Sequence, residues 1–530
     1  MGTIRGGWTV LWAVVCMVMC GGASMSLAGA AVEGQEQLRH VQEQCGLTRY
    51  PTLCVRTLAG SGSADILSAL VNKTILETKL PSSYFSQIAS LHETQGSQHA
   101  AAVTDYCEDA MTLSLKRLEQ SLEALKEPGK NKGDVQTWLS AAMTLQESCK
   151  DSARGLDAHG LSSDHGTRLF QKMDYLAQLT SNALALVNRI THRRQPSRTG
   201  KNRNLGEMRD FPNWVSKKDR RLLESAEVQA NAVVAKDGTG NYRTVSEAIQ
   251  AASGERFVIY VKAGVYKEKI HANKDGITLI GDGKYSTIIT GDSSNAGGAS
   301  LSGTATFTIT GDGFIARDIG FQNTAGPQGR QAVAVTVASD HSVFYRCSIA
   351  GYQDTLYAHV LRQFYRECDI YGTVDFIFGN AAAVFQNCEL VVRNRGNKAF
   401  TVILANGRTD PGQNTGFTVQ RCRITSNSGG SYLGRPWKYY SRAVVMQSTI
   451  DGGLSPRGWI EWPGYGSSVL RTLYFAEYAN QGPGAGTSGR VQWPGFHLIG
   501  AQEAVKFTVQ SLISGNSWLP STGVAFTSGL

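Results

Sequence analysis

The sequence has little proline, 13 of its 530 residues, and after residue 20 it has no apolar run long enough to span a bilayer. It also lacks a Gly-X-Y period, so its 58 glycines do not indicate a collagen. Charged residues make up only 18% of the chain and hydrophobic residues 42%, which excludes a disordered chain or a coiled coil. Many glycines with few prolines instead predict numerous turns between short strands.

The net charge of +9 is concentrated in one short stretch. Arg189 to Arg221 holds 11 Lys and Arg residues against three acidic residues, a local charge of +8. A basic face spread over a folded domain is therefore not indicated, and we expect no nucleic-acid partner. The length of 530 residues allows two to four domains.

The first 30 residues have the pattern of a secretory leader. Arg5 precedes an apolar run from Trp8 to Cys20, and the small residues Ala28-Gly29-Ala30 follow. This order predicts a signal peptide at residues 1–30, and the alternative is an uncleaved signal anchor. Asn72-Lys73-Thr74 is a glycosylation sequon that suits a secreted protein.

Eight of the ten cysteines lie outside the leader, four in each half of the chain. Because none has C-x-x-C spacing or accompanying paired histidines, we predict disulfides rather than a zinc site. The predicted pairs are Cys45–Cys54, Cys107–Cys149, Cys347–Cys368 and Cys388–Cys422.

Residues 31–190 are predicted to form an all-α four-helix bundle. Asp105 to Leu125 and Thr137 to Cys149 place apolar residues three and four apart, and few strand-like runs interrupt them. Residues 191–228 form a polar, basic linker. The linker contains Arg220-Arg221-Leu222-Leu223, a dibasic sequence that is either a processing site or a solvated charge run.

Residues 229–530 have short β-branched and aromatic runs separated by glycine. A short phrase recurs there as FYRCSI, YRECDI, FQNCEL, VQRCRI and VMQSTI, and its cysteines are 21, 20 and 34 residues apart. Such periods predict stacked coils of about three short strands each, as in an all-β parallel β-helix. Coils about 4.8 Å apart would suit the Cys347–Cys368 pair. A β-sandwich is the competing fold, but it would not explain the repeated phrase.

The same period places four polar residues on adjacent coils. Asp354 and Asp375 each lie seven residues after a cysteine of the repeat, and Gln331 precedes Gln353 by 22 residues. Two carboxylates in contact cannot both ionise easily, so one would act as an acid while the other, held by a cation, attacks. The glutamine amides would stabilise an oxyanion. The alternative is that these four side chains form a polar ladder whose only role is to hydrogen-bond the turns of the β-helix.

Several motifs, in order, resemble plant pectin methylesterases that carry an inhibitor-like pro-region. The motifs of the second half are Gly238-Thr239-Gly240-Asn241-Tyr242, Gly313-Phe314-Ile315-Ala316-Arg317-Asp318-Ile319, Gln331-Ala332-Val333-Ala334, Gly351-Tyr352-Gln353-Asp354-Thr355-Leu356-Tyr357, Asp375-Phe376-Ile377-Phe378-Gly379-Asn380 and Leu433-Gly434-Arg435-Pro436-Trp437. Those of the first half, Thr48-Arg49-Tyr50-Pro51 and Asp134-Val135-Gln136-Thr137-Trp138, resemble the four-cysteine bundle of pectin methylesterase inhibitors.

The resemblance implies a right-handed parallel β-helix that hydrolyses methyl esters of homogalacturonan in the cell wall, releasing methanol, with no metal or organic cofactor. Asp375 would be the nucleophile, and Asp354 the general acid and later the base. Gln331 and Gln353 would stabilise the oxyanion, and Arg435 would keep Asp375 ionised.

The resemblance also implies substrate contacts and partners. Trp437 would stack on a sugar ring, and Tyr357 and Phe378 are further candidates for the cleft. The expected partners are pectin, separate inhibitor proteins and a subtilisin-like protease that cuts the linker of a secreted monomer. Residues 31–190 would mask the enzyme before that cut. Two departures from the family pattern are Leu301, where threonine is usual, and Asn406, where glutamine is common.

Two other functional classes fit parts of the pattern. A β-helical pectin lyase or polygalacturonase would share the fold, although no cluster of acids suited to Ca²⁺ accompanies Gln331, Asp354 and Asp375. A purely binding protein could have a similar polar surface. It would not need Arg435 together with the ladder, that is, the four residues Gln331, Gln353, Asp354 and Asp375.

Overall fold

The computed structural model describes most of the two predicted halves of the chain. The described residues are 34–59, 65–80, 85, 97–158, 164–190, 229–395, 400–426 and 429–530. The predicted signal peptide, the linker and its sequence Arg220-Arg221-Leu222-Leu223 lie outside them. No helix within these ranges is both long enough and apolar enough to cross a membrane.

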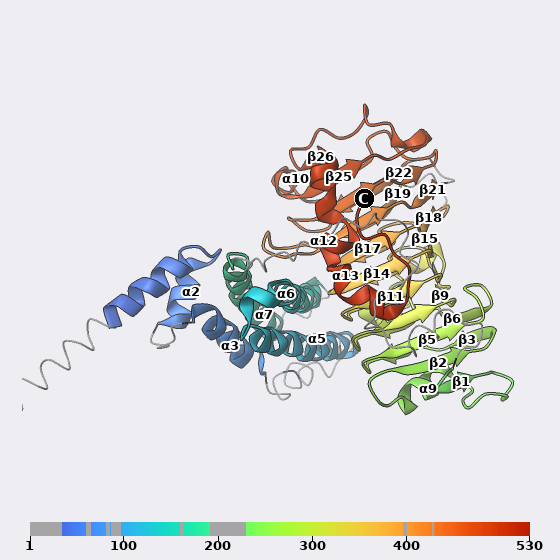
Figure 1. Ribbon diagram of the computed structural model, residues 1–530, viewed down its shortest axis with the longest axis horizontal. Helices are drawn as coiled ribbons and strands as arrows, with labels where there is room; N and C mark the ends of the chain where they lie inside the picture. Colours follow the sequence, from blue (N-terminus) through green and yellow to red (C-terminus); the bar gives the residue numbers. More distant parts are fainter. Residues whose placement is uncertain are drawn as a thin grey trace, which may run out of the picture.

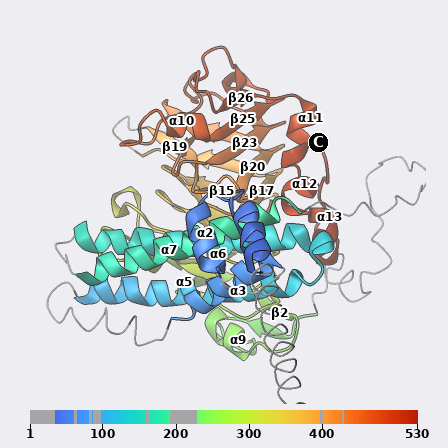
Figure 2. The ribbon, with the colours of Figure 1, turned by 90° about the vertical axis from the view of Figure 1, so that its left-hand side faces the viewer.

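The described residues between 34 and 190 form a helical domain. Its helices include α2 (Pro51–Leu58), α3 (Ile66–Thr78), α5 (Ser97–Ala124), α6 (Pro128–Ala158) and α7 (Asp164–Val187). The last four make a bundle in which each packs against two others, and Figure 2 shows α5, α6 and α7 side by side. Buried leucines from all four helices meet at its centre, among them Leu70, Leu118, Leu139 and Leu184. The predicted helical bundle is confirmed.

Two disulfides fasten the helical domain. Cys45 is bonded to Cys54 of α2 with a Cα–Cα distance of 5.5 Å, and Cys107 of α5 is bonded to Cys149 of α6 with 5.0 Å. Both predicted pairs in this half are confirmed. The second bond closes the longer loop, of 42 residues, and so constrains the unfolded chain more than the first, which closes nine.

The strands of residues 229–530 form three sheets. Sheet 1 contains, in spatial order, β1 (Ala232–Val234), β2 (Phe257–Val261), β5 (Ile277–Gly281), β8 (Ile315–Arg317), β11 (Ser342–Tyr345), β14 (Arg362–Arg366), β17 (Ala382–Gln386), β20 (Gly416–Gln420), β23 (Arg442–Met446), β25 (Tyr474–Tyr478) and β26 (Phe496–Leu498). Sheet 2 contains β4 (Ile270–Ala272), β7 (Phe307–Ile309), β10 (Val335–Val337), β13 (Leu356–Ala358), β16 (Ile377–Gly379), β19 (Thr401–Asn406) and β22 (Ser431–Pro436). Sheet 3 contains β3 (Gly264–Lys267), β6 (Thr287–Gly291), β9 (Gly320–Asn323), β12 (Ser348–Ala350), β15 (Asp369–Gly372), β18 (Glu389–Val392), β21 (Arg423–Ser426) and β24 (Thr449–Ile450).

The chain visits the sheets in a fixed order through most of these coils. It runs from sheet 1 to sheet 3 to sheet 2 and back, as in β11, β12 and β13, and neighbouring strands within each sheet pair in parallel. This is the predicted parallel β-helix (Figure 1), and the sandwich alternative, which pairs its strands antiparallel, is wrong. The core is a continuous stack of apolar side chains, with Phe307, Phe321, Phe344 and Phe385 fully buried.

The recurring phrase marks the bend between sheet 1 and sheet 3. In each copy, the residue before the cysteine, or before the serine that replaces it, has a left-handed backbone with φ between 51° and 55°. The chain bends at this residue. These residues are Arg346, Glu367, Asn387, Arg421 and Gln447. The residue that follows then points into the core, which is why the phrase repeats with an inward cysteine.

The four cysteines of this half are buried free thiols, so the predicted Cys347–Cys368 and Cys388–Cys422 disulfides are corrected. The flanking strands pair residue for residue, which stacks the cysteines in register. In-register neighbours keep their Cβ atoms near the strand spacing of about 4.8 Å, wider than the 3.5–4.5 Å that a disulfide needs. The thiol of Cys368 instead contacts the carbonyl of Phe344 at 3.3 Å.

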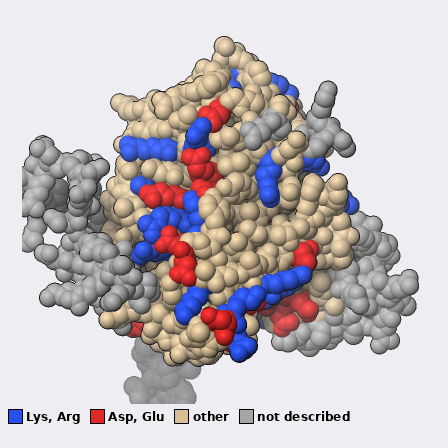
Figure 3. Space-filling model, turned by 90° about the vertical axis from the view of Figure 1, so that its right-hand side faces the viewer, with Lys and Arg blue, Asp and Glu red and all other residues tan. Residues whose placement is uncertain are grey.

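Helices cover part of the β-helix. α12 (Val509–Ile513) and α13 (Gly515–Trp518) pack on sheet 1 through Ile513 and Trp518. The helical domain lies over the turns that lead from sheet 2 to sheet 1, where Val360 and Leu361 join its apolar contacts. The side of the β-helix away from the helical domain, shown in Figure 3, carries Lys and Arg interleaved with Asp and Glu rather than a patch of one sign.

Ion pairs of two buried arginines, Arg117 and Arg362, link the helical domain to the β-helix. Arg117 of α5 donates two hydrogen bonds of 2.7 Å to the Asp312 carboxylate. Arg362 of β14 pairs with Asp340 at 2.7 Å and with Asp134 of α6 at 2.6 Å. Loss of one partner would leave a buried guanidinium without a counter-charge. These contacts therefore stabilise the docked arrangement of the two domains.

The thiol state of the second half is directly testable. When the chain is denatured without reductant and treated with iodoacetamide, peptides that carry Cys347, Cys368, Cys388 and Cys422 should be alkylated, as mass spectrometry would show. The four cysteines of the helical domain should react only after reduction, which provides the internal control. Protection of the β-helix cysteines before reduction would mean that this stack is oxidised after all.

Candidate active site

The structure brings the four polar residues of the ladder together on adjacent coils. Gln331 pairs with Gln353 in a parallel bridge ahead of β10 and β13. Leu356 pairs with Ile377, and this register sets Asp354 opposite Asp375 at the starts of β13 and β16. The 21-residue spacing of the two aspartates and the 22-residue spacing of the two glutamines therefore predict their register correctly.

A left-handed backbone positions both carboxylates. Asp354 has φ of 60° and Asp375 has φ of 50°, and both lie where the chain turns from sheet 3 into sheet 2. Aspartate tolerates this conformation better than most residues, yet it still costs on the order of 1 kcal/mol. Backbone strain of this kind is found at functional sites as well as at the structural bends described above.

Arg435 of β22 holds one of the two carboxylates. Its Nε donates to Asp375 Oδ1 at 2.8 Å and its Nη2 to Oδ2 at 2.5 Å, a bidentate pair in which both side chains are at least nine-tenths buried. The ring of Trp462 lies over the guanidinium, 4.0 Å from ring centroid to Cζ. The cation is therefore fixed by a planar contact as well as by its two hydrogen bonds.

The two carboxylates differ in protonation. Burial, together with the charge of Asp375, raises the pKa of Asp354 well above its ordinary value. Burial also raises the pKa of Asp375, but the hydrogen bonds and charge of Arg435 oppose that rise. Asp375 therefore loses its proton first, and Asp354 stays neutral beside it.

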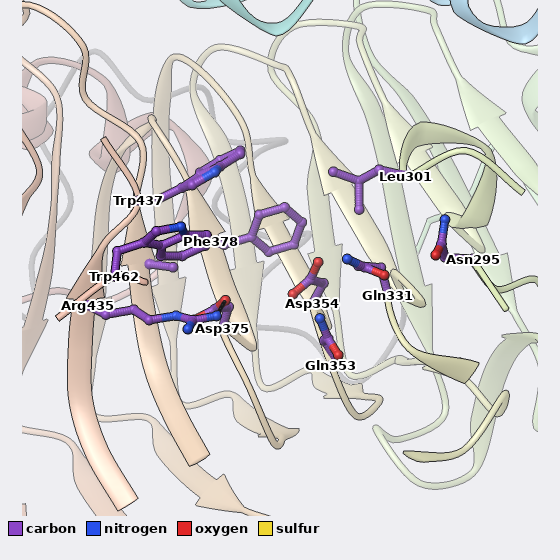
Figure 4. Close-up of a pocket in the computed structure, with 11 residues that line it drawn as sticks. Asn295, Leu301, Gln331, Gln353, Asp354, Asp375, Phe378, Arg435, Trp437 and Trp462 are labelled. Atoms are coloured by element: carbon purple, nitrogen blue, oxygen red, sulfur yellow. Dashed lines mark hydrogen bonds and ion pairs between the residues drawn. The ribbon is translucent and has the colours of Figure 1, made fainter. Parts of the chain in front are cut away.

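These groups line a cavity of about 260 Å³. The remaining lining residues, seen in Figure 4, are Asn295, Leu301, Gln331, Gln353, Phe378, Ala405, Trp437 and Trp462. In Figure 4 the amide nitrogens of Gln331 and Gln353 lie at the end of each side chain nearer Asp354. The cavity thus joins an anion, a neutral acid and two amide donors under an aromatic wall.

The aromatic residues predicted to contact the substrate lie in two layers of that wall. Phe378 lines the cavity with Trp437, whose ring meets it edge-on at 5.9 Å. Tyr357 stacks on the far side of Phe378 at 4.4 Å and lines a second cavity instead. Sequence reasoning missed Asn295 and Trp462, because both lie in loops outside the repeated coils and no period points to them.

The second cavity, of about 300 Å³, lies between the helical domain and the β-helix. It shares Asn295, Leu301 and Trp437 with the first cavity, so the two meet along one rim. Its other lining residues are Ala102, Val103, Tyr106, Ser148, Asp151 and Ser152 from the helical domain, and Ser300, Ser302 and Tyr357 from the β-helix. The helical domain therefore forms one wall of the extended site.

The two departures from the family pattern have different places. Leu301 lies in the cavity wall, so the loss of a hydroxyl there changes a surface that a ligand would touch. Asn406 is buried outside the cavity, where it donates to the carbonyl of Gly379 and accepts from the backbone N–H of Arg442. Asn72 is exposed on α3, and its glycosylation stays a prediction.

Two family models match the chain. The model described as "Pectinesterase" matches residues 231–516, and the model described as "Plant invertase/pectin methylesterase inhibitor" matches residues 39–186. The first range holds all the ladder residues together with Arg435 and Trp437.

Individual relatives agree with both models. "Probable pectinesterase/pectinesterase inhibitor 54" of Arabidopsis thaliana is 48% identical over 493 residues, covering 88% of this chain and 89% of its own. "Pectinesterase 2" of Citrus sinensis is 43% identical over 506 residues, covering 92% and 95%. The solved structure of a pectin methylesterase from carrot is 50% identical with a TM-score of 0.56, and it covers 58% of this chain and all of the carrot chain.

The electrostatics predict opposite effects of two isosteric substitutions on stability. In the unfolded chain Asp354 ionises near pH 4, whereas the folded protein keeps its proton to higher pH. The folded state then binds one more proton, so its stability falls by about 1.4 kcal/mol per pH unit until Asp354 ionises. Asp354→Asn cannot ionise and does not lose this stability. Its melting temperature should therefore exceed that of the wild type by a margin that grows as the pH rises from 4.5 to 8.

Asp375→Asn is the matched control. It leaves the buried Arg435 without its counter-charge and should destabilise the β-helix by about 3–5 kcal/mol. Calorimetric melting of the three proteins across the same pH range measures both effects. An Asp354→Asn variant less stable than the wild type throughout would contradict the assignment of Asp354 as the neutral partner.

Proposed function

Because the chain belongs to the pectinesterase family and carries an inhibitor-type domain ahead of the enzyme, we propose that it removes methyl esters from homogalacturonan by an Asp375 nucleophile and an Asp354 acid and base. The single observation that carries this proposal is the buried carboxylate pair, in which Arg435 donates hydrogen bonds to one member, Asp375. The family match decides among the enzymatic alternatives in favour of the esterase.

The first half-reaction forms an acyl-enzyme. A carboxylate oxygen of Asp375 attacks the C6 carbonyl carbon of a methyl galacturonate, and the carbonyl electrons move to its oxygen. The amide groups of Gln331 and Gln353 donate to that oxyanion. As the oxyanion collapses, the C–O bond to the methoxy group breaks, and Asp354 gives its proton to the departing methanol.

The second half-reaction restores the enzyme. Asp354, now a carboxylate, takes a proton from water, and the hydroxide attacks the galacturonate carbonyl of the anhydride. Asp375 leaves as a carboxylate and regains its full pairing with Arg435. The sum is ester plus water to galacturonic acid plus methanol, and Asp354 is protonated again for the next cycle. The released acid then loses its proton to solvent and becomes galacturonate.

The cavity wall supports a sugar ligand. Flat apolar rings suit the faces of a pyranose, and Trp437 and Phe378 offer them beside the carboxylates. Leu301, which also lines the cavity, offers an apolar surface where the family usually has a threonine. We therefore expect the methyl-esterified sugar to enter between these walls.

The precursor part of the proposal concerns the leader, the linker and the helical domain. The chain is secreted to the cell wall, glycosylated at Asn72 and cut at Arg220-Arg221-Leu222-Leu223 by a subtilisin-like protease. Until the cut, the helical domain masks the cleft. The support for masking is the second cavity, one wall of which comes from α5 and α6.

Loss of the nucleophile tests the mechanism. Asp375→Asn should reduce methanol release from methyl-esterified pectin by at least about a thousandfold, because an amide does not form the anhydride. Asp354→Asn should also lose activity while staying folded. Methanol is quantified on samples whose circular dichroism is native, and near-wild-type turnover of either variant would refute the assigned roles.

The role of Arg435 is tested by the pH profile. Activity requires Asp375 ionised and Asp354 protonated, so kcat/KM for methanol release should fall at both ends of the pH range. Removing the guanidinium in Arg435→Met raises the pKa of Asp375, so the acid limb should move upward by about 1–3 pH units. Arg435→Lys keeps the charge and should shift it less. An unmoved acid limb in Arg435→Met would show that Asp375 is not the group that titrates there.

A further inference from the structure

A lysine at the edge of the cleft is paired with a carboxylate of the helical domain. Lys438 directly follows Trp437, and its ammonium lies 5.8 Å from the centroid of that ring. Its Nζ contacts Asp151 Oδ2 of α6 at 2.6 Å. We propose that Lys438 binds a free carboxylate of the pectin chain and that Asp151 occupies this position in the uncut protein; the inference rests on the proposed function.

The β-helix alone positions the lysine. The hydroxyl of Ser441 accepts a hydrogen bond from the Lys438 backbone N–H and donates one to the Lys438 carbonyl, closing the turn after β22. That strand also carries Arg435. These hydrogen bonds fix the backbone at Lys438, and both residues belong to the β-helix.

Among the described residues, the ion-pair partner of Lys438 belongs to the helical domain. That partner is Asp151 of α6. Glu147, which also lies on α6 and interacts electrostatically with Lys438, pairs with Lys150 at 2.6 Å. Within the described part of the β-helix no acid forms an ion pair with Lys438. Once the helical domain departs, this ammonium is left for another anion.

The anion at this position lies on the path of the polymer. Asp151 lines the second cavity together with Trp437 and Leu301, and these two residues also line the catalytic cavity. A sugar stacked on Trp437 beside the catalytic carboxylates would have its neighbour in the chain on this side. The carboxylate of such a neighbour and that of Asp151 are the same chemical group.

The pairing discriminates between two forms of the substrate. A de-esterified galacturonate carries a carboxylate that can pair with Lys438, whereas a methyl-esterified one carries a neutral ester that cannot. Lys438 would therefore favour esters that lie next to galacturonates already hydrolysed. In the uncut chain Asp151 mimics such a galacturonate.

The first experiment compares two substrates on residues 229–530, whose main hydrophobic core contains no residue of the helical domain. Lys438→Met should raise KM about three- to tenfold on partly de-esterified pectin and leave kcat/KM on fully methyl-esterified pectin unchanged. Lys267→Met, which removes an exposed lysine of sheet 3 paired with Asp292, is the control and should change neither.

The outcomes separate this inference from the function on which it rests. No methanol from either substrate with the unsubstituted protein would overturn the proposed function. Methanol from both, with equal KM ratios for Lys438→Met and the unsubstituted protein, would overturn the role of Lys438 alone.

The second experiment uses the full chain. Asp151→Asn frees Lys438 and should increase binding of trigalacturonate to the uncut protein several-fold in calorimetry, an increase that Asp151→Asn with Lys438→Met should lack. Asp134→Asn is the matched control, since it breaks another ion pair of α6, with Arg362 at 2.6 Å, away from Trp437. If Asp134→Asn increased binding equally, the gain would come from loosening of the domain, and the mimicry would be refuted.

Discussion

The site depends on one constraint, the in-register stacking of short parallel strands. Strands about 4.8 Å apart repeat the same direction at each coil, so residues one period apart point the same way and meet. This brings Asp354 opposite Asp375 and sets Gln331 beside Gln353. The same stacking places the four cysteines of the β-helix in a buried row, in which they are free thiols.

Stacking alone would give two equivalent carboxylates, and the chemistry needs them to differ. Arg435 supplies the difference from two coils away, on β22, with Trp462 holding its plane from a loop further along. A carboxylate with two charge-assisted hydrogen bonds keeps its negative charge in a buried site, and its neighbour, which has none from Arg435, keeps its proton. The asymmetry therefore comes from one side chain rather than from the fold of the coils.

The helical domain is related to the site by charge as well as by shape. It sits on the turns between sheet 2 and sheet 1, and its arginines and aspartates pair with partners of opposite sign on the β-helix. One of those partners, Lys438, lies beside the aromatic wall of the cleft. A domain that neutralises a basic group at the edge of a polyanion-binding site competes with the polymer for that group, besides covering the surface.

From the sequence by itself came the two domains, the coil period, the four ladder residues and the disulfides of the helical half, because each depends on local spacing. A 21-residue period places Asp354 and Asp375 together whatever the details of the turns. The tertiary structure decided what spacing does not encode: the free thiols, the contributions of Trp462 and Asn295 from irregular loops, and the pairing of Lys438 with Asp151. The last joins residues 287 positions apart, and only the docking of one domain on the other brings such residues into contact.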